Sequence, residues 1–260
     1  MATYLDTIVA AHRGAADRDG RSLGDLVGKA ADVPPARGFA SALRRGTTLS
    51  VISEIKRRSP SKGDLFPDLV PADLARTYEA GGASCLSVLT DNEFFGGSVD
   101  DLQKARDACR LPVLRKDFTV DGRDVADARL MGADAVLLIV AALSDDELRS
   151  CHELATELGL DVLVEVHDER ELDRAAAAGA TLIGVNQRDL TTFTVDRDLA
   201  AKLRPAMPEG AVTVAESGVR GRADAEALVA AGYDAVLVGE SLVTSADPGA
   251  AVKELLVPCS

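Results

Sequence analysis

The sequence predicts an α/β protein built as a (β/α)8 TIM barrel, residues 48–260, preceded by an N-terminal helical extension, residues 1–47, within a single domain. Eight short apolar runs recur along the chain, and each is followed by a turn and a stretch with helical periodicity. This alternation, at intervals of about 20 to 35 residues, is typical of βαβ units that form a parallel sheet. A doubly wound open sheet would usually show about five or six strands and a glycine fingerprint after the first. The first run is followed instead by RRSPSKG, so we expect a closed barrel.

Local signals predict the individual strands and helices. The strands are LSVISEIK from Leu49, ASCLSVLT from Ala83, LPVLRKDF from Leu111, ADAVLLIV from Ala133, LDVLVEVH from Leu160, TLIGVNQR from Thr181, AVTVAESG from Ala211 and YDAVLVGE from Tyr233. Stretches between them, such as PADLARTYEAGG, carry apolar residues near i, i+3, i+4 and i+7 and end at glycine, and Ser144 and Asp168 stand where N-caps belong. In the extension, YLDTIVAAHR places Leu5, Ile8 and His12 on one helical face, and GFASALRRG is a second helix candidate. We expect this extension to pack on the barrel.

Composition and charge exclude several kinds of partner and site. Asp plus Glu outnumber Lys plus Arg by 42 to 29, which gives a net charge of −13 and would repel nucleic acid, although one local pocket for a small anion is compatible with it. The four cysteines have no C-x-x-C spacing and the three histidines no metal-ligand spacing, so we expect no disulfide framework, metal or cofactor. The start lacks a signal-peptide pattern, and no apolar run approaches about 18 residues. We expect a cytoplasmic protein that binds no membrane, and a monomer rather than an oligomer.

Polar side chains break the apolar pattern at the carboxyl ends of five predicted strands. They are Glu54 and Lys56, Lys116 and Asp117, Glu165, Asn186 and Arg188, and Glu216 and Ser217. Buried parallel strands are almost wholly apolar, and in a barrel their carboxyl ends meet at the face where active sites are built. Any one of these residues could be a solvated charge at a strand end. Scattered surface charges would not select the same end of successive strands, so the cluster predicts a functional site.

Glycine-containing loops follow the last two predicted strands. ESGVRG and VGESL place Gly218 and Gly239 at the entrance of short helical turns, where backbone N–H groups can bind a phosphate. Either glycine alone could be an ordinary turn residue. Together, at the recurring phosphate site of such barrels, they predict a phosphorylated small-molecule substrate. Of the histidines, His12 and His152 lie in predicted helices as interface residues, whereas His167 follows the strand that carries Glu165 and could border the site.

Seven segments together resemble the indole-3-glycerol-phosphate synthase family of tryptophan biosynthesis. They are SEIKRRSPSKG, LTDNEFFGG, LPVLRKDF, LVEVHDEREL, GVNQRDL, VAESGV and VLVGESLV, from about Leu49 to Leu242. The resemblance implies conversion of 1-(2-carboxyphenylamino)-1-deoxy-D-ribulose 5-phosphate to indole-3-glycerol phosphate, with loss of carbon dioxide and water. It implies that Lys116 is the general acid that protonates the ketone oxygen and that Glu165 is the general base of the dehydration. The other implied roles are Lys56 to orient the substrate, Glu54 and Asn186 to hold these groups, Ser59, Arg188, Glu216 and Ser217 to contact the substrate, and Gly218, Gly239 and Glu240 to bind its phosphate.

The acid–base roles carry expectations about protonation. A lysine is the better acid if desolvation or neighbouring cations lower its pKa, and a carboxyl flanked by valines should have a raised pKa. We therefore expect a lowered pKa for Lys116 and a raised one for Glu165. The loop RRSPSKG, with Ser59, Ser61 and Lys62 as donors, is expected to fold over the substrate.

Two positions depart from the family pattern, and two alternative functions stay open. Gln187 stands where a second Asn is expected and should point away from its neighbour, and Glu240 replaces a small polar residue, so its side chain must turn outward. Phosphoribosylanthranilate isomerase needs a Cys and Asp pair at strand ends, but Cys85 lies near the beginning of its strand. A non-catalytic protein that only binds sugar phosphates should have lost Lys56, Lys116 or Glu165, and all three residues are present.

Overall fold

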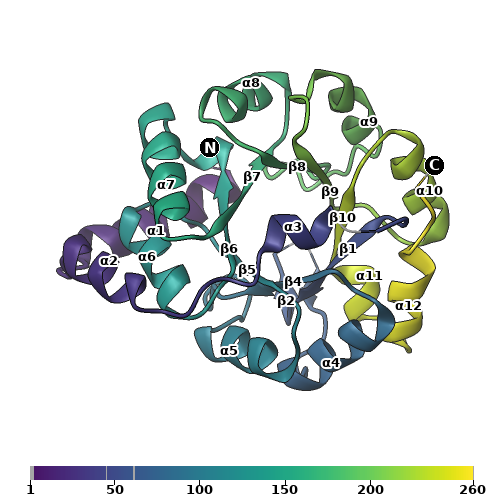
Figure 1. Ribbon diagram of the computed structural model, residues 1–260, viewed down its shortest axis with the longest axis horizontal. Coiled ribbons are helices and arrows are strands. Elements are labelled where there is room, and N and C mark those ends of the chain that lie inside the picture. Colours follow the sequence, from purple (N-terminus) through teal and green to yellow (C-terminus); the bar gives the residue numbers. More distant parts are fainter. Residues whose placement is uncertain (1–2, 45, 61, 260) are drawn as a thin grey trace.

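The computed structural model describes residues 3–44, 46–60 and 62–259. Eight parallel strands close into a barrel in the order β1-β10-β9-β8-β7-β6-β5-β4, which confirms the predicted fold class (Figure 1). The strands are β1 (Ser50–Ile55), β4 (Cys85–Leu89), β5 (Val113–Lys116), β6 (Ala135–Ile139), β7 (Asp161–Val166), β8 (Leu182–Asn186), β9 (Val212–Glu216) and β10 (Ala235–Val238). Each lies within the apolar run that predicted it. Ser61, one of the donors expected in the loop after β1, lies outside the described residues.

Helices surround the barrel (Figure 1). They are α4 (Pro71–Gly81), α5 (Val99–Ala108), α6 (Gly122–Leu130), α7 (Asp145–Glu157), α8 (Glu169–Ala177), α9 (Leu199–Leu203), α10 (Arg222–Ala230), α11 (Glu240–Val243) and α12 (Pro248–Leu255), with 3-10 turns η1 (Val140–Ala142) and η2 (Arg204–Ala206). The predicted N-caps are confirmed: Ser144 accepts the N–H of Glu147, and Asp168 accepts the N–H of Glu171. These bonds satisfy donors that the first helical turn leaves free.

Strand alternation decides which side chains reach the mouth of the barrel. In β7, Val162 and Val164 pack toward the surrounding helices, whereas Leu163 packs in the barrel interior. Because successive side chains point to opposite faces of a strand, Glu165 continues the interior row of Leu163. The same step of two residues leads from Ile52 to Glu54, from Leu114 to Lys116, from Leu182 to Asn186 by way of Gly184, and from Val214 to Glu216. The register of the apolar core therefore aims the polar residues into one space.

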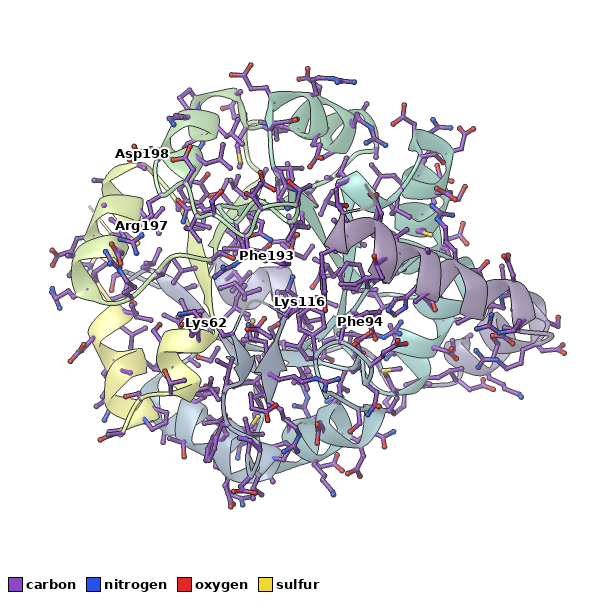
Figure 2. The ribbon with its side chains drawn as sticks, turned by 180° about the vertical axis from the view of Figure 1, so that it is seen from behind. Lys62, Phe94, Lys116, Phe193, Arg197 and Asp198 are labelled. Atoms are coloured by element: carbon purple, nitrogen blue, oxygen red, sulfur yellow. The ribbon has the colours of Figure 1, made fainter. Side chains whose placement is uncertain are left out.

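Three helices precede the barrel: α1 (Tyr4–Arg18), α2 (Leu23–Ala31) and α3 (Phe39–Leu43). Helix α3 covers the amino ends of the strands, where Ser50 Oγ donates to the carbonyl of Leu43 over 2.9 Å and the N–H of Ala40 donates to Asp161 over 2.8 Å. Helix α1 lies on the opposite face, as a comparison of Figure 1 with Figure 2 shows. The predicted packing of the extension is confirmed, although α2, with the sequence LGDLVGKAA, was not predicted. That the chain forms a single domain stays a prediction.

The segment after β1 contains a short hairpin, β2 (Arg58–Ser59) and β3 (Gly63–Asp64). It stands at the carboxyl face of the barrel, where the sequence predicted a loop over the substrate. Within the described part of the chain, no helix has the length and apolar character needed to cross a membrane.

Candidate active site

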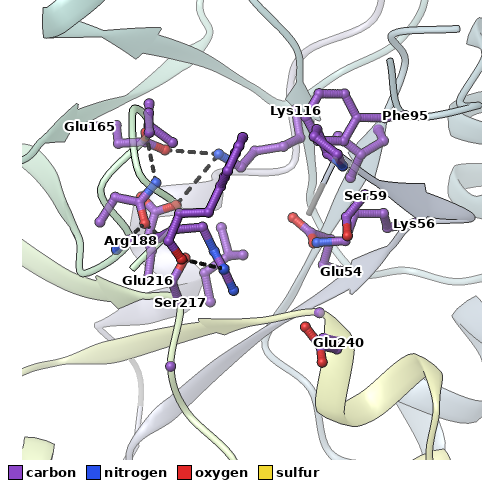
Figure 3. Close-up of a pocket in the computed structure, with 18 of the residues that line it drawn as sticks. Glu54, Lys56, Ser59, Phe95, Lys116, Glu165, Arg188, Glu216, Ser217 and Glu240 are labelled. Atoms are coloured by element: carbon purple, nitrogen blue, oxygen red, sulfur yellow. Dashed lines mark hydrogen bonds and ion pairs between the residues drawn. The ribbon is translucent and has the colours of Figure 1, made fainter. Parts of the chain in front are cut away.

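A cavity of about 480 Å³ opens at the carboxyl end of the barrel. Its volume is in the range typical of sites for small molecules. All twelve site residues predicted from the sequence line it: Glu54, Lys56, Ser59, Lys116, Glu165, Asn186, Arg188, Glu216, Ser217, Gly218, Gly239 and Glu240. Figure 3 shows the charged ones grouped around one space. The structure thus brings together residues from the five strands of the strand-end pattern and from the loop after β10.

Lys116 lies between two buried carboxylates. Its Nζ is 2.9 Å from Oε2 of Glu165 and 3.5 Å from Oε2 of Glu216 (Figure 3). Asn186 Nδ2 donates to Oε1 of Glu165 over 3.0 Å, and Ser217 Oγ donates to Oδ1 of Asn186 over 2.8 Å. This chain of donors holds the Asn186 amide and so fixes the Glu165 carboxylate facing Lys116.

Two glycines make room for the carboxylates. A Cβ on Gly184 of β8 would overlap Oε1 of Glu216. A Cβ on Gly239 would overlap Oε1 of Glu54, which is paired with Nζ of Lys56. Any side chain at these positions would displace a site carboxylate. Gly184 was not selected from the sequence, because a strand sequence does not show which side chain of a neighbouring strand packs against a glycine.

The cations of the segment after β1 divide into two groups. Arg57 turns away from the cavity, where it pairs with Asp101 at 2.8 Å and donates to main-chain carbonyls, and Arg58 donates to the carbonyl of Asn92 over 3.0 Å. Lys56 and Lys62 line the cavity. The arginines therefore hold neighbouring loops, and the lysines are the members of this segment that can reach a ligand.

The loops after β9 and β10 differ in part from the expectation. Gly239 stands at the N-cap position of α11, as predicted. No helix begins at Gly218 in the described chain, since the next one, α10, starts at Arg222. Ser217 and Gly218 instead take left-handed backbone angles, with φ of 64° and 80°. The predicted helical entrance at Gly218 is wrong, and its backbone faces the cavity from a tight turn.

Comparison with known proteins identifies the family. A family model described as indole-3-glycerol phosphate synthase matches residues 5–255. The chain belongs to the indole-3-glycerol phosphate synthase family. The family that the seven sequence segments resemble is therefore confirmed.

Relatives of this indole-3-glycerol phosphate synthase family member include the indole-3-glycerol phosphate synthase 2 of Streptomyces coelicolor, which is 56% identical over 236 residues, 91% of each chain. Two solved structures share the fold at low identity. A thiamine phosphate pyrophosphorylase from Pyrococcus furiosus is 20% identical, with a TM-score of 0.60 over 80% of this chain and 93% of that one. A 3-hexulose-6-phosphate synthase is 18% identical, with a TM-score of 0.62 over 80% of this chain and 98% of that one.

In this member of the indole-3-glycerol phosphate synthase family, the site carboxylates have different protonation states. Burial lowers the pKa of Lys116, but Glu165, Glu216 and Glu54 outweigh it and raise that pKa. Burial raises the pKa of Glu165, but Lys116 and His167 outweigh it and lower that pKa. Burial raises the pKa of Glu216, more than Lys116 lowers it. These directions favour a cationic Lys116, an anionic Glu165 and a protonated Glu216.

The expected pKa directions for Lys116 and Glu165 are therefore wrong. The expectations considered burial and, for Lys116, neighbouring cations, whereas in the fold the two groups form an ion pair that stabilises the charged form of both. The carboxyl group with the raised pKa is that of Glu216, whose Oε1 has no hydrogen-bond partner among the described residues. A protonated lysine and an ionised carboxylate, which these pKa directions favour, are the forms from which a general acid and a general base act.

Helix α1 supplies part of the cavity wall, which the sequence did not predict. Tyr4, Leu5 and Ile8 line the cavity. Further residues found only in the structure are Phe95, Phe118, Leu137, Ile139, Leu190, Phe193, Arg197 and Arg220. The apolar face of the extension is the one sequence signal for this wall, and such a face indicates packing without showing that it borders a cavity.

His12 anchors α1 over the barrel. Its Nε2 is 3.0 Å from Oδ2 of Asp91 and 3.8 Å from Oδ1 of Asp117. These three groups are close enough to share a metal ion, but Asp91 already accepts the N–H of Phe94 and Asp117 the N–H of Phe118. Burial lowers the pKa of His12, and the two aspartates outweigh it and raise that pKa. The expected interface role of His12 is confirmed.

The two departures from the family pattern behave as expected. Gln187 Nε2 donates to the carbonyl of Ser217 over 2.8 Å, whereas Asn186 bonds to Glu165. Glu240 lines the cavity, but its side chain is 41% exposed and pairs with Lys62 Nζ at 3.2 Å. Both substitutions are thus accommodated without disturbing the contact between Lys116 and Glu165.

Proposed function

We propose that this protein catalyses the closure of the indole ring, converting 1-(2-carboxyphenylamino)-1-deoxy-D-ribulose 5-phosphate to indole-3-glycerol phosphate, carbon dioxide and water. The observation that carries the proposal is the placement of Lys116 between Glu165 and Glu216 in a cavity lined by both apolar and cationic side chains. The family membership supplies the reaction class. A monomeric, cytoplasmic enzyme without metal or cofactor is part of this proposal.

The cavity wall matches the two ends of this substrate. Ile8, Phe95 and Phe118 offer apolar surface for the aromatic ring. Lys62 and Arg220 bring positive charge to the loops of Gly218 and Gly239, where a phosphate would lie, while Arg188 is available for the ring carboxylate. The ketone between these ends would then come within reach of Lys116.

The reaction needs two proton deliveries and one removal. As the ring carbon that bears the carboxylate bonds to the ketone carbon, Lys116 protonates the ketone oxygen, which becomes a hydroxyl group. Loss of carbon dioxide returns the bonding electrons to the ring and restores its aromaticity. The hydroxyl group then leaves as water with a second proton, and Glu165 removes one proton from the new five-membered ring. Each turnover therefore takes up one proton from the solvent.

The remaining residues hold this arrangement. Asn186 and Ser217 fix the carboxylate of Glu165, and Glu54 fixes Lys56, which orients the substrate. Holding the two reacting carbons together removes much of the entropic cost of ring closure. Ser59 and Glu216 complete the polar surface around the sugar chain.

Product fluorescence tests the proposal directly. The protein has no tryptophan, so indole fluorescence after addition of the substrate reports the product without background from the chain. Lys116→Met and Glu165→Gln should each lower kcat by about 10²- to 10⁴-fold, the usual contribution of a general acid or base. Lys104→Met, at an exposed lysine of α5, is the control and should leave kcat unchanged. Absence of product from the folded, unmodified protein would refute the function.

Phosphoribosylanthranilate isomerase activity is not supported by the site. Cys85 opens β4 at the amino end of the barrel, where its Sγ lies 3.7 Å from the carbonyl oxygen of Phe39 in α3. It is fully buried, and burial raises its pKa well above the ordinary value. A thiol there cannot reach a ligand at the mouth.

A further inference from the structure

His167 lies directly behind the proposed base and outside the cavity. It follows β7, and its Nε2 is 3.4 Å from Oε1 of Glu165, the oxygen that also accepts a bond from Asn186. This nitrogen is buried and has no hydrogen-bond partner among the described residues, so Glu165 is its nearest anion. The ring is therefore next to Oε1 of Glu165, whereas Lys116 contacts the other oxygen, Oε2.

Glu171, in the first turn of α8, holds the other side of the ring. Its Oε2 is 3.0 Å from Nδ1 of His167 and accepts the main-chain N–H of the same residue over 2.8 Å. The side chains of His167 and Glu171 are each only 16% exposed. Because the backbone N–H of His167 also binds this oxygen, the Glu171 carboxylate is fixed in place, and the imidazole cannot rotate away from Glu165 without losing its contact with Glu171.

The charge of this imidazole matters most after the first proton transfer. In the resting site Lys116 balances the charge of Glu165, whose side chain is 1% exposed. Once Lys116 has given its proton to the ketone, that cation is gone, and an isolated carboxylate at this depth would take up a proton. A protonated Glu165 could not act as the base of the later dehydration.

We infer that His167, held by Glu171, is a positioning residue that supplies a permanent positive charge behind Glu165 and keeps this carboxylate ionised while Lys116 is neutral. The interval in which Lys116 is neutral follows from the proposed function, whereas the contacts of His167 do not depend on that function. The charged groups facing the ring are Glu165 from β7 and Glu171 from α8, with Lys116 from β5 beyond Glu165.

The protonation of His167 agrees with this arrangement. Burial lowers the pKa of its imidazole, but Glu165 and Glu171 outweigh it and raise the pKa to about 10. His152, whose pKa burial lowers, provides a contrast within the same chain. With three histidines in the chain, imidazole signals in ¹⁵N-edited NMR spectra can be resolved individually. We expect His167 to stay protonated across the neutral range, and titration near its ordinary value would overturn the inference whether or not the enzyme is active.

Two variants test the catalytic consequence. His167→Gln keeps an N–H donor near Glu165 but carries no charge, so kcat should fall at least about tenfold, the change that corresponds to one pKa unit, with KM little altered. Glu171→Gln keeps an acceptor for the ring and the backbone but removes the anion that favours the imidazolium. In this variant His167 should lose its proton at a lower pH, so the decrease of kcat at alkaline pH should begin about one pH unit lower than in the wild type. Glu169→Gln, at an exposed glutamate of the same helical turn, is the matched control and should leave the profile unchanged.

The outcomes separate this inference from the proposed function. If the wild type forms product and His167→Gln has the same kcat, the charge behind Glu165 is irrelevant and the inference is overturned. If His167→Gln does not fold, an unshifted alkaline limb in Glu171→Gln overturns it equally. If the wild type forms no product, the proposed function fails, and the NMR titration still decides whether His167 is a permanent cation.

Discussion

Glu216 offers a stringent test of the electrostatics of the site, because Glu216→Gln copies the shape of its protonated form. The side chain is 2% exposed, and burial raises its pKa above the ordinary 4.5. From pH 4.5 up to the raised folded pKa, the folded protein keeps a proton that the unfolded chain has lost. Stability from this group is complete below the unfolded pKa and is lost as pH rises through the folded pKa.

The size of the effect follows from this single proton. One proton released on unfolding lowers the free energy of unfolding by about 1.4 kcal/mol per pH unit. Between about pH 5 and pH 7 the free energy of unfolding of the wild type should therefore fall by up to about 2.7 kcal/mol relative to that of Glu216→Gln. Urea unfolding followed by circular dichroism measures both proteins at each pH, and Glu157→Gln, at an exposed position of α7, should follow the wild type.

Catalysis gives the second half of this test. Because the glutamine mimics the protonated carboxyl group, Glu216→Gln should retain kcat within about tenfold, whereas Glu165→Gln should lose about 10²- to 10⁴-fold. Parallel stability curves for wild type and Glu216→Gln would show that Glu216 is ionised in the fold. A loss of kcat as large as that of Glu165→Gln would refute the assignment of the two carboxylates to opposite protonation states.

Two further substitutions probe the packing around the site. Gly184→Ala should push the carboxylate of Glu216 away from Lys116 and change kcat in the fluorescence assay. It should also lower the free energy of unfolding by about 1–3 kcal/mol, as overpacking does. Gly28→Ala, where a methyl group meets open space, is the control, and equal stability of the two variants would contradict the close approach of Glu216 to Gly184. Tyr78→Phe removes a buried hydroxyl that donates to the carbonyl of Glu54 over 3.2 Å, so urea unfolding should show a loss of about 1 kcal/mol with kcat nearly unchanged, and no loss would mean that this bond contributes nothing.

Much of this protein could be predicted from local sequence. Alternating apolar runs and amphipathic stretches predicted the closed barrel, because a parallel strand and a packed helix each impose a short-range period. The strand-end rule placed Glu54, Lys116, Glu165 and Glu216 at one mouth, since every parallel strand of a barrel delivers its carboxyl end to the same face. Family motifs then pointed to the reaction, and the matched family agrees with them.

Only the tertiary structure decided which of these groups carry charge and what surrounds them. The pKa of Glu165 depends on Lys116, which lies on a different strand, and that of Glu216 depends on burial against Gly184 of the neighbouring strand. The same holds for α1, whose apolar face turned out to complete the cavity wall as well as to pack. Periodicity and residue type are local properties of a chain, whereas desolvation and ion pairing are sums over neighbours that only the closed barrel brings together.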